Sequence, residues 1–177
     1  MSGDWVNKRG QVWIETVIYT LIGLAIIGLV LAVAKPAIDE KKDEVIIEQS
    51  IESLENINDK IFEVQRATGN SRAIDLKIGK GRLIFDVEND KISWIIESRF
   101  EYSEIDSTIS LGNVDVHTRE STPYEVGLSM NYEMDIRFGD QETGVKELGA
   151  APTNYKLIIK NTGINEEEKI IIEIREA

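Results

Sequence analysis

Apolar residues dominate one long stretch near the start of the chain. Residues 12–34 form a run of about 23 residues in which Glu15 is the only charged member. A helix of that length extends roughly 34 Å, which is enough to cross the hydrocarbon core of a bilayer. Basic residues flank the run, Lys8 and Arg9 before it and Lys35 after it, as is typical of segments anchored at membrane interfaces. The pattern predicts a membrane-inserted helix.

Beyond Pro36 the apolar pattern becomes one-sided. Pro36 lacks a backbone N–H donor, so we expect a kink or a short break in the helix near it. Apolar residues then recur three or four positions apart with charged residues between them, which is the spacing of an amphipathic helix. Gly69 supplies a helix stop signal. We therefore expect one helical region over residues 11–67, whose second half lies against a globular domain. The apolar stripe consists of Ile47, Ile51, Leu54, Ile57, Ile61 and Val64.

The remaining residues, 70–177, predict an acidic antiparallel β domain. Short runs rich in Ile, Val and aromatic residues alternate with turn signals, including residues 79–81 and 88–90 at hairpin spacing. The last two runs flank a polar connection and form the clearest hairpin, whereas residues 139–154 predict a long surface loop. Strands without intervening helices favour a sandwich or rolled sheet, so the predicted fold class is α+β. The expected strands are 76–78, 82–87, 91–96, 108–111, 114–117, 124–132, 135–138, 155–160 and 169–173.

Three fates are open for the N-terminal segment. As a secretory signal it would be cleaved after Ala32-Val33-Ala34, and a secreted β domain starting at Lys35 would remain. As an uncleaved single-pass anchor it would hold the β domain at the membrane. Neither fate gives Glu15 a role, although an acid inside an apolar segment is costly.

The third fate rests on a short motif at the start of the apolar run. The stretch KRGQVWIET places a basic pair and Gly10 directly before the run, with Glu15 five positions after Gly10. This stretch resembles the class III signal peptide of archaeal type IV pilin-like proteins. The resemblance implies that a prepilin peptidase removes residues 1–10 as a leader and that Gln11 becomes the new N-terminus. Trp13 stands where one pilin subgroup with the same starting Gln has Ser.

The same resemblance implies a role for Glu15. In related filaments the acid at this position meets the free α-amine of a neighbouring subunit, because the two charges are far less costly paired than alone in an apolar bundle. Glu15 would then set the axial register of the subunits. The alternative is an acid that snorkels to the membrane interface or favours the positive end of the helix dipole. Small residues in the apolar run would let two helices approach closely. The expected assembly residues are therefore Glu15, Gly23, Gly28, Ala32 and Pro36.

A structural protein is the function that this resemblance implies. The subunit would lie in the cell membrane first and then assemble with copies of itself into an extracellular type IV pilus-like filament, of the kind used for adhesion or surface attachment. Its partners would be itself, the prepilin peptidase and the membrane before assembly. The alternative from another class is a membrane-anchored or secreted β binding module of the cell envelope that does not polymerise.

Composition excludes several other functions. The chain has 177 residues and a formal net charge of −12, and the excess lies after the apolar run, because the charges before Lys35 cancel. An acidic surface disfavours nonspecific nucleic-acid binding and favours solubility. The chain contains no cysteine, which excludes disulfides, a thiolate nucleophile and a cysteine metal site.

Residues with catalytic chemistry are sparse. His117 is the sole histidine, so a histidine-rich metal site is excluded and any catalytic triad would depend on this one residue. The motif KIGKGR, residues 77–82, lacks the spacing of a phosphate-binding loop. The acidic clusters at residues 86–90 and 166–168 lack the ligand spacing of a calcium loop. We expect no catalytic residue, no cofactor and no metal.

Overall fold

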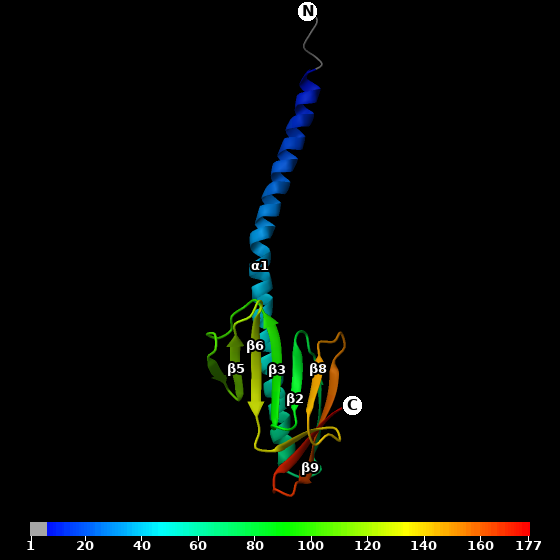
Figure 1. Cartoon of the computed structure of the whole chain (residues 1–177). Coiled ribbons are helices and arrows are strands. Elements are labelled where there is room, and N and C mark those ends of the chain that lie inside the picture. The colour runs from blue at the N-terminus through cyan, green and yellow to red at the C-terminus, as the bar shows by residue number, and fades with distance from the viewer. Residues whose placement is uncertain (1–6) are drawn as a thin grey trace, which may run out of the picture. The chain divides into compact units, whose positions relative to one another are not determined.

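The computed structural model describes the backbone of residues 7–177 and the side chains of residues 12–177. One long N-terminal apolar helix is followed by two β-sheets whose strands are mostly antiparallel (Figure 1). This is the α+β fold class that the sequence predicts. Contacts within the chain define two compact units, one ending at Glu40 and one spanning Lys41 to Ala177. We call the second one the domain unit.

Helix α1 spans Asn7–Gln65 and contains 59 residues, with Pro36 inside it. The short break predicted near Pro36 is therefore absent. A proline removes only one hydrogen bond from a long helix, and its neighbours Ala34, Lys35 and Ala37 are strong helix formers, so the helix continues through it. The helix ends two residues before the predicted position 67.

Ten strands follow α1 in the described part of the chain. The bounds predicted at 108–111 and 135–138 match two of them. The strands are β1 Ser71–Leu76, β2 Arg82–Asp86, β3 Lys91–Ser98, β4 Thr108–Leu111, β5 Val114–Arg119, β6 Tyr124–Asn131, β7 Asp135–Phe138, β8 Val145–Gly149, β9 Tyr155–Ile164 and β10 Ile170–Glu176. The strand predicted at 76–78 shares only residue 76 with the observed β1, no strand was predicted where β8 lies, and the remaining strands differ from the prediction at their ends.

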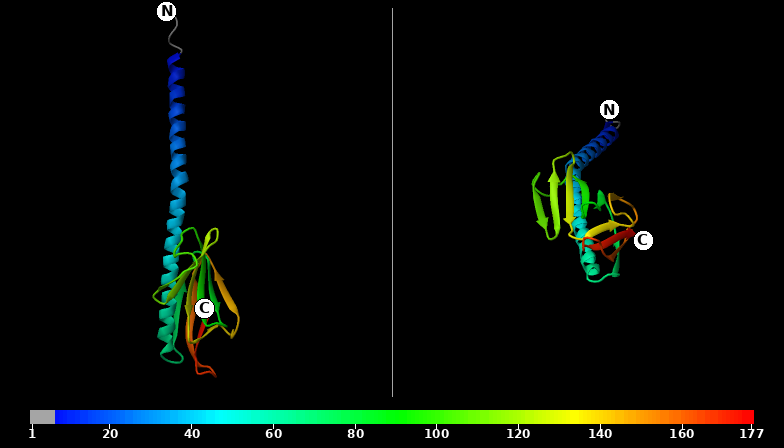
Figure 2. Two further views of the ribbon diagram at one scale, coloured as in Figure 1. Left: turned by 60° about the vertical axis from the view of Figure 1, so that its left-hand side comes forward. Right: turned by 60° about the horizontal axis from the view of Figure 1, so that its bottom comes forward.

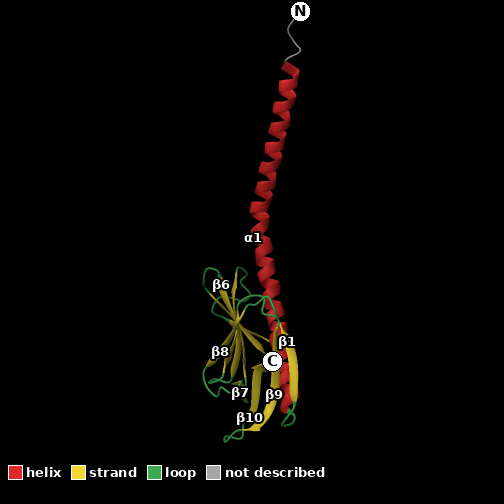
Figure 3. Ribbon diagram, turned by 90° about the vertical axis from the view of Figure 1, so that its right-hand side faces the viewer, coloured by secondary structure: helices red, strands yellow, loops and turns green. Residues whose placement is uncertain are grey.

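These strands form two sheets. One has four strands in the order β1-β9-β10-β7, and the other has six in the order β4-β5-β6-β3-β2-β8. Figure 1 shows β5, β6, β3 and β2 side by side, and Figure 3 shows β1, β9 and β10 in the other sheet. Every neighbouring pair is antiparallel except β7 and β10, which run parallel. The predicted antiparallel sheet is thus correct for all pairs but one.

Two predicted hairpins are confirmed and one is wrong. β2 and β3 pair across residues 88–90, with Asp86 opposite Lys91, and β9 pairs with β10. The turn signal at residues 79–81, however, does not join a hairpin, because β1 pairs with β9 and belongs to the other sheet. A glycine-rich turn shows that the chain changes direction, but it does not specify which strand the next one pairs with.

Strand β8 lies inside the segment predicted as a long loop, residues 139–154. Only Leu148 of this strand is buried, so its sequence lacks the alternation that marks a strand. Its structure comes from pairing with β2, where Leu148 stands opposite Leu83. The edge of an existing sheet therefore imposes the strand conformation on a sequence with little preference for it.

The predicted apolar stripe of α1 is buried in the domain unit. All six of its residues are less than 9% exposed, and they join the inward-facing residues of both sheets in one hydrophobic core. Figure 2 shows the second half of α1 lying along the sheets. The largest buried side chain is Trp94, whose Nε1 donates to the carbonyl of Lys80 at 3.1 Å. Burial of these side chains, at roughly 25 cal/mol per Å² of apolar surface, holds the helix to the sheets.

The C-terminal end of α1 is capped by a residue nearly a hundred positions away. The Asn161 side chain is buried, and its Nδ2 donates to the carbonyls of Val64 at 3.3 Å and of Gln65 at 3.2 Å. Gly69, in the left-handed region with φ of 87°, donates its N–H to the Asn161 carbonyl at 2.8 Å. Because the last carbonyls of a helix lack intrahelical partners, Asn161 satisfies two of them and joins α1 to β9.

A buried carboxylate joins the start of the domain unit to two loops. Asp43 on α1 forms an ion pair with Lys80, and its second oxygen accepts the backbone N–H of Arg99 at 2.8 Å. Partial burial acts to raise the pKa of Asp43, but the bonds from Lys80 and Arg99 outweigh it and hold this pKa below the ordinary value. The contact therefore stabilises the folded domain as long as Asp43 is ionised.

Replacing Asp43→Asn is expected to lower the free energy of unfolding by about 1–3 kcal/mol at neutral pH, because the charge that pairs with Lys80 is lost. The folded-state pKa is lowered, so the wild-type advantage is present above the ordinary pKa of 3.8 and disappears as the pH falls through the folded-state value. Denaturant unfolding of the full chain in detergent at pH 7 and pH 3 measures both effects. Glu147→Gln, at the exposed pair with Arg82, is the control and should cost under about 0.5 kcal/mol; an equal loss in both variants would contradict the prediction.

Candidate functional site

The first half of α1 exposes its apolar side chains on every side. We call residues 12–34 the apolar segment. Its large apolar side chains keep from 43% of their surface exposed, at Val17, to 76%, at Trp13. Soluble monomers rarely expose a continuous apolar patch of more than a few hundred Å². The apolar segment therefore requires an apolar environment outside the chain described here.

Helix α1 is long and apolar enough to cross a membrane, judged by its length and composition, and no other helix in the described residues is. Its apolar part lies near the N-terminus, where signal sequences have the same character. The structure is thus compatible with membrane anchoring through the apolar segment.

Polar side chains in the apolar segment lie close to its start. The hydroxyl of Thr16 donates to the carbonyl of Val12 at 2.9 Å, and that of Thr20 donates to the carbonyl of Thr16 at 2.8 Å. Glu15 is exposed, and no hydrogen bond or ion pair joins it to another described side chain. The threonines are therefore satisfied within the helix, whereas the carboxylate of Glu15 is available to a partner from outside.

The small residues predicted to mediate helix contacts have no role within one copy. A Cβ atom added at Gly23 or at Gly28 would meet nothing within 4 Å, so packing inside the described chain does not require glycine at either position. Ala32 and Pro36 are exposed on the same helix. Contact of these residues with a second helix remains a prediction.

The predicted processing residues are Lys8, Arg9, Gly10 and Gln11. Their backbone belongs to α1, but their side chains lie outside the described residues. The cleavage motif therefore rests on the sequence alone.

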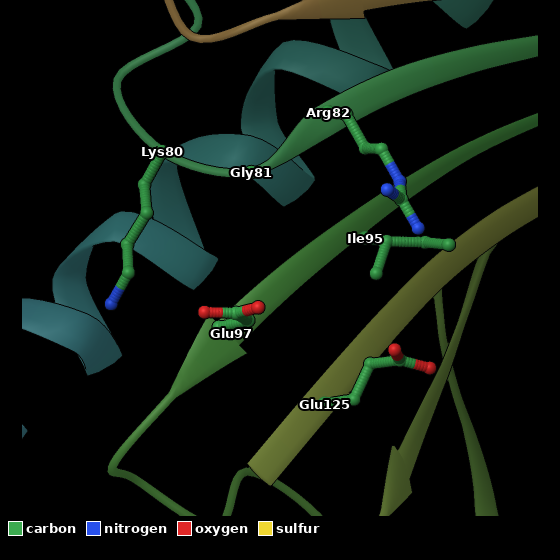
Figure 4. Close-up of a pocket in the computed structure, with 6 residues that line it drawn as sticks. All are labelled: Lys80, Gly81, Arg82, Ile95, Glu97 and Glu125. Atoms are coloured by element: carbon green, nitrogen blue, oxygen red, sulfur yellow. The ribbon is translucent and has the colours of Figure 1, made fainter. Parts of the chain in front are cut away.

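The motif KIGKGR borders a shallow hollow on the six-stranded sheet (Figure 4). Gly81 has φ of 77°, and a Cβ there would lie 2.1 Å from the Ile95 carbonyl oxygen, so only glycine fits. Figure 4 shows Lys80 pointing toward α1, where its Nζ pairs with Asp43. The hollow has a volume of 280 Å³ and is lined by Lys80, Gly81, Arg82, Ile95, Glu97 and Glu125. The lining contains no serine, threonine, cysteine or histidine, and Lys80 is engaged in its ion pair with Asp43.

The two acidic clusters of the sequence meet in a second hollow, of 690 Å³, beside β7 and the β9–β10 connection. Basic side chains lie among them: Lys169 pairs with Asp90 at 3.3 Å, and Arg137 pairs with Asp135 at 2.9 Å. The hydrogen bond from Arg137 lowers the pKa of Asp135. No group of acidic or histidine side chains in the described residues is arranged to hold a metal ion. Arg137 pairs with Asp135 on its own strand β7 and with Glu142 in the segment that follows this strand, contacts that the sequence analysis did not predict.

His117 has a structural contact. It lies half-buried on β5, and its Nδ1 is 3.1 Å from the carbonyl oxygen of Ser107. In the described residues, no hydroxyl or carboxylate side chain forms a hydrogen bond with His117. A catalytic triad built around this residue therefore has no support in the structure.

Comparison of the chain with protein-family models, with curated proteins and with solved structures finds no match.

Removal of residues 1–34 is expected to leave the domain unit folded and soluble, because residues 12–34, the part of this segment whose side chains are described, contribute no buried core residue. The thermal midpoint of the shortened chain should lie within about 5 °C of that of the full chain in detergent. Circular dichroism and size-exclusion chromatography without detergent measure folding and solubility. Aggregation of the shortened chain, or loss of its β-sheet signal, would show that the apolar segment also supports the fold.

Proposed function

We propose that the protein is a structural, pilin-like subunit of an extracellular type IV pilus-like filament that serves adhesion or surface attachment. A prepilin peptidase cleaves it between Gly10 and Gln11, and the mature chain assembles with copies of itself through the apolar segment. The membrane holds the subunit before assembly. The proposal assigns the protein no enzymatic activity and no cofactor.

The observation that carries this proposal is an exposed apolar helix joined to a separately packed domain. The core of the domain unit is built from residues after Lys41, and the large apolar side chains of the apolar segment are exposed. A bilayer supplies an apolar environment before assembly, and a bundle of the same helices supplies one afterwards. Because apolar surface stays out of water throughout, the gain on assembly comes from packing and from polar pairs between helices.

Glu15 supports an assembly role over simple anchoring. A lone carboxylate in the apolar segment costs a few kcal/mol on membrane insertion, and a plain anchor gains nothing in return. After cleavage, the ammonium of Gln11 in a neighbouring copy would lie within an apolar bundle with this carboxylate, and the pair is less costly than two isolated charges. The acid then favours assembly in one register.

The distribution of charge also suits a filament subunit. The net charge of −12 lies after the apolar segment, on the part of the chain that would face water. Charge of one sign keeps such domains soluble, while the apolar segment drives association. The two halves of the chain therefore have the separate properties that a filament core and a filament surface require.

The first experiment is the N-terminal sequence and intact mass of the protein recovered from its native cell envelope. A chain that starts at Gln11 supports prepilin-type processing. A chain that starts at Lys35 identifies a secreted β binding module, and a chain that keeps residues 1–10 identifies a membrane anchor. Either of the last two results overturns the proposal.

Replacement of Glu15→Ala is expected to abolish filaments or to disorder them, because the register-setting charge is removed, while the unfolding of the domain unit stays unchanged. Electron microscopy of shed filaments and thermal unfolding of the purified protein measure the two effects. Glu104→Ala, at an exposed acid of the domain unit, is the matched control and should assemble normally. Filaments of normal yield and order from the Glu15→Ala variant would contradict the assembly role.

A further inference from the structure

One tyrosine in the apolar segment lies on the same face of the helix as Glu15. At about 100° of rotation per residue, positions four apart lie one above the other, roughly 6 Å apart along the axis. Tyr19 is four positions after Glu15, in the first half of α1 (Figure 1). The Glu15 carboxylate and the Tyr19 phenol therefore lie on one side of a helix whose surface is otherwise mostly apolar.

The hydroxyl of Tyr19 differs from those of the neighbouring threonines. Thr16 and Thr20 donate to carbonyls one turn earlier in the same helix, so their transfer to an apolar environment costs little. The Tyr19 side chain is 72% exposed, and no described residue forms a hydrogen bond with its hydroxyl. A phenol without a partner in an apolar environment is destabilising, and buried tyrosine hydroxyls usually have one.

We infer that Tyr19 of one copy donates a hydrogen bond to Glu15 of a neighbouring parallel copy, displaced by four residues along the helix axis. This inference rests on the proposed function, and it adds a second contact to the same interface. The phenol supplies a donor and the carboxylate an acceptor, so the two groups are complementary. A hydrogen bond to a charged acceptor is stronger than one between neutral groups.

The same displacement brings a second pair of groups together. Positions 11, 15 and 19 are evenly spaced, four residues apart. A displacement that places Glu15 of the second copy beside Tyr19 of the first therefore also places the mature N-terminus of the second copy, at Gln11, beside Glu15 of the first. One axial shift of roughly 6 Å therefore aligns both contacts. Residues 11, 15 and 19 also fall within about 80° of the helix circumference, so a single face carries the complete row.

Repetition of this contact satisfies every polar group in the row. Each Glu15 carboxylate receives the phenol of one neighbour and the ammonium of another, and a carboxylate has acceptor sites enough for both. An axial slip of one or two residues, about 1.5–3 Å, would lengthen both contacts together and weaken the hydrogen bond and the ion pair. Tyr19 is thus a positioning residue for filament register.

Replacement of Tyr19→Phe removes only the hydroxyl, and it is expected to reduce filament yield roughly tenfold at limiting subunit concentration, as loss of one charge-assisted hydrogen bond does. Thr20→Val is the matched control, because the Thr20 hydroxyl is satisfied within its own helix, and its filaments should form normally. Equal yields from both variants would overturn the inference and would leave Tyr19 as a residue that anchors the helix at the membrane interface.

Cysteine cross-linking tests the displacement itself. The chain has no cysteine, so introduced pairs react alone, and a disulfide requires Cβ atoms about 3.5–4.5 Å apart. The variant with Ile22→Cys and Ile26→Cys carries thiols four residues apart on the Glu15 face, and it should form multimer ladders on oxidation of filaments. The variant with Ile22→Cys and Leu29→Cys places thiols seven residues apart on the same face, and it should form at least tenfold fewer links.

The outcomes separate the inference from the proposed function. A native chain that keeps residues 1–10 overturns both. If mature filaments form, but the seven-residue pair links as well as the four-residue pair, the displacement is wrong while the filament remains. Mature filaments with a ladder only from the four-residue pair, together with the loss in Tyr19→Phe, support the inference.

Discussion

The apolar surface of the first half of α1 is the constraint on which the rest of the molecule depends. Residues 12–34 expose large apolar side chains all round the helix. In the second half of the same helix, only one stripe is apolar, and both sheets bury it. One continuous helix thus belongs to two environments, and the change of pattern after Pro36 marks the transition between them.

The domain unit holds the second half of α1 at three levels. Asp43 binds Lys80 and the backbone of Arg99 near its start, the apolar stripe packs along its length, and Asn161 caps its last carbonyls. The contacts come from loops and strands far apart in the sequence. Because they all engage the same helix, separating α1 from the sheets would expose the core, a carboxylate and unpaired carbonyls together. The second half of α1 is therefore an integral part of the domain unit and of its core.

Polar groups are placed differently in the two environments. In the apolar segment, the hydroxyls of Thr16 and Thr20 are satisfied by the helix itself. The carboxylate of Glu15 and the hydroxyl of Tyr19 are not satisfied by any described residue, and they share one face of the helix. In the domain unit, charged groups pair between segments far apart in the sequence, as Lys80 does with Asp43 and Lys169 does with Asp90. A polar group away from water needs a hydrogen-bond or ion-pair partner. Within the single helix the threonines find that partner one turn away, whereas in the folded domain the partners lie far apart in the sequence.

The sequence alone determined the features that depend on local pattern. The 3.6-residue period of the stripe predicted the buried face of α1, and the turn signal at residues 88–90 predicted the β2–β3 hairpin, because both connect residues near in sequence. It also identified Glu15 as an acid in an apolar helix, which remains the basis of the proposed site. The stripe and the β2–β3 hairpin are confirmed, because helix periodicity and a tight turn between adjacent strands depend on local backbone geometry.

Only the tertiary structure decided which distant segments meet. It paired β1 with β9, made β7 and β10 parallel, and turned residues 145–149 into a strand at the edge of β2. It also placed Asn161 at the end of α1 and brought residues of the two acidic clusters into the lining of one hollow, where Lys169 pairs with Asp90. Such contacts depend on burial and pairing across the whole fold, and a strand of weak pattern such as β8 takes its conformation from its neighbour. The sequence of a single segment does not contain that information, because the partner that stabilises it lies elsewhere in the chain.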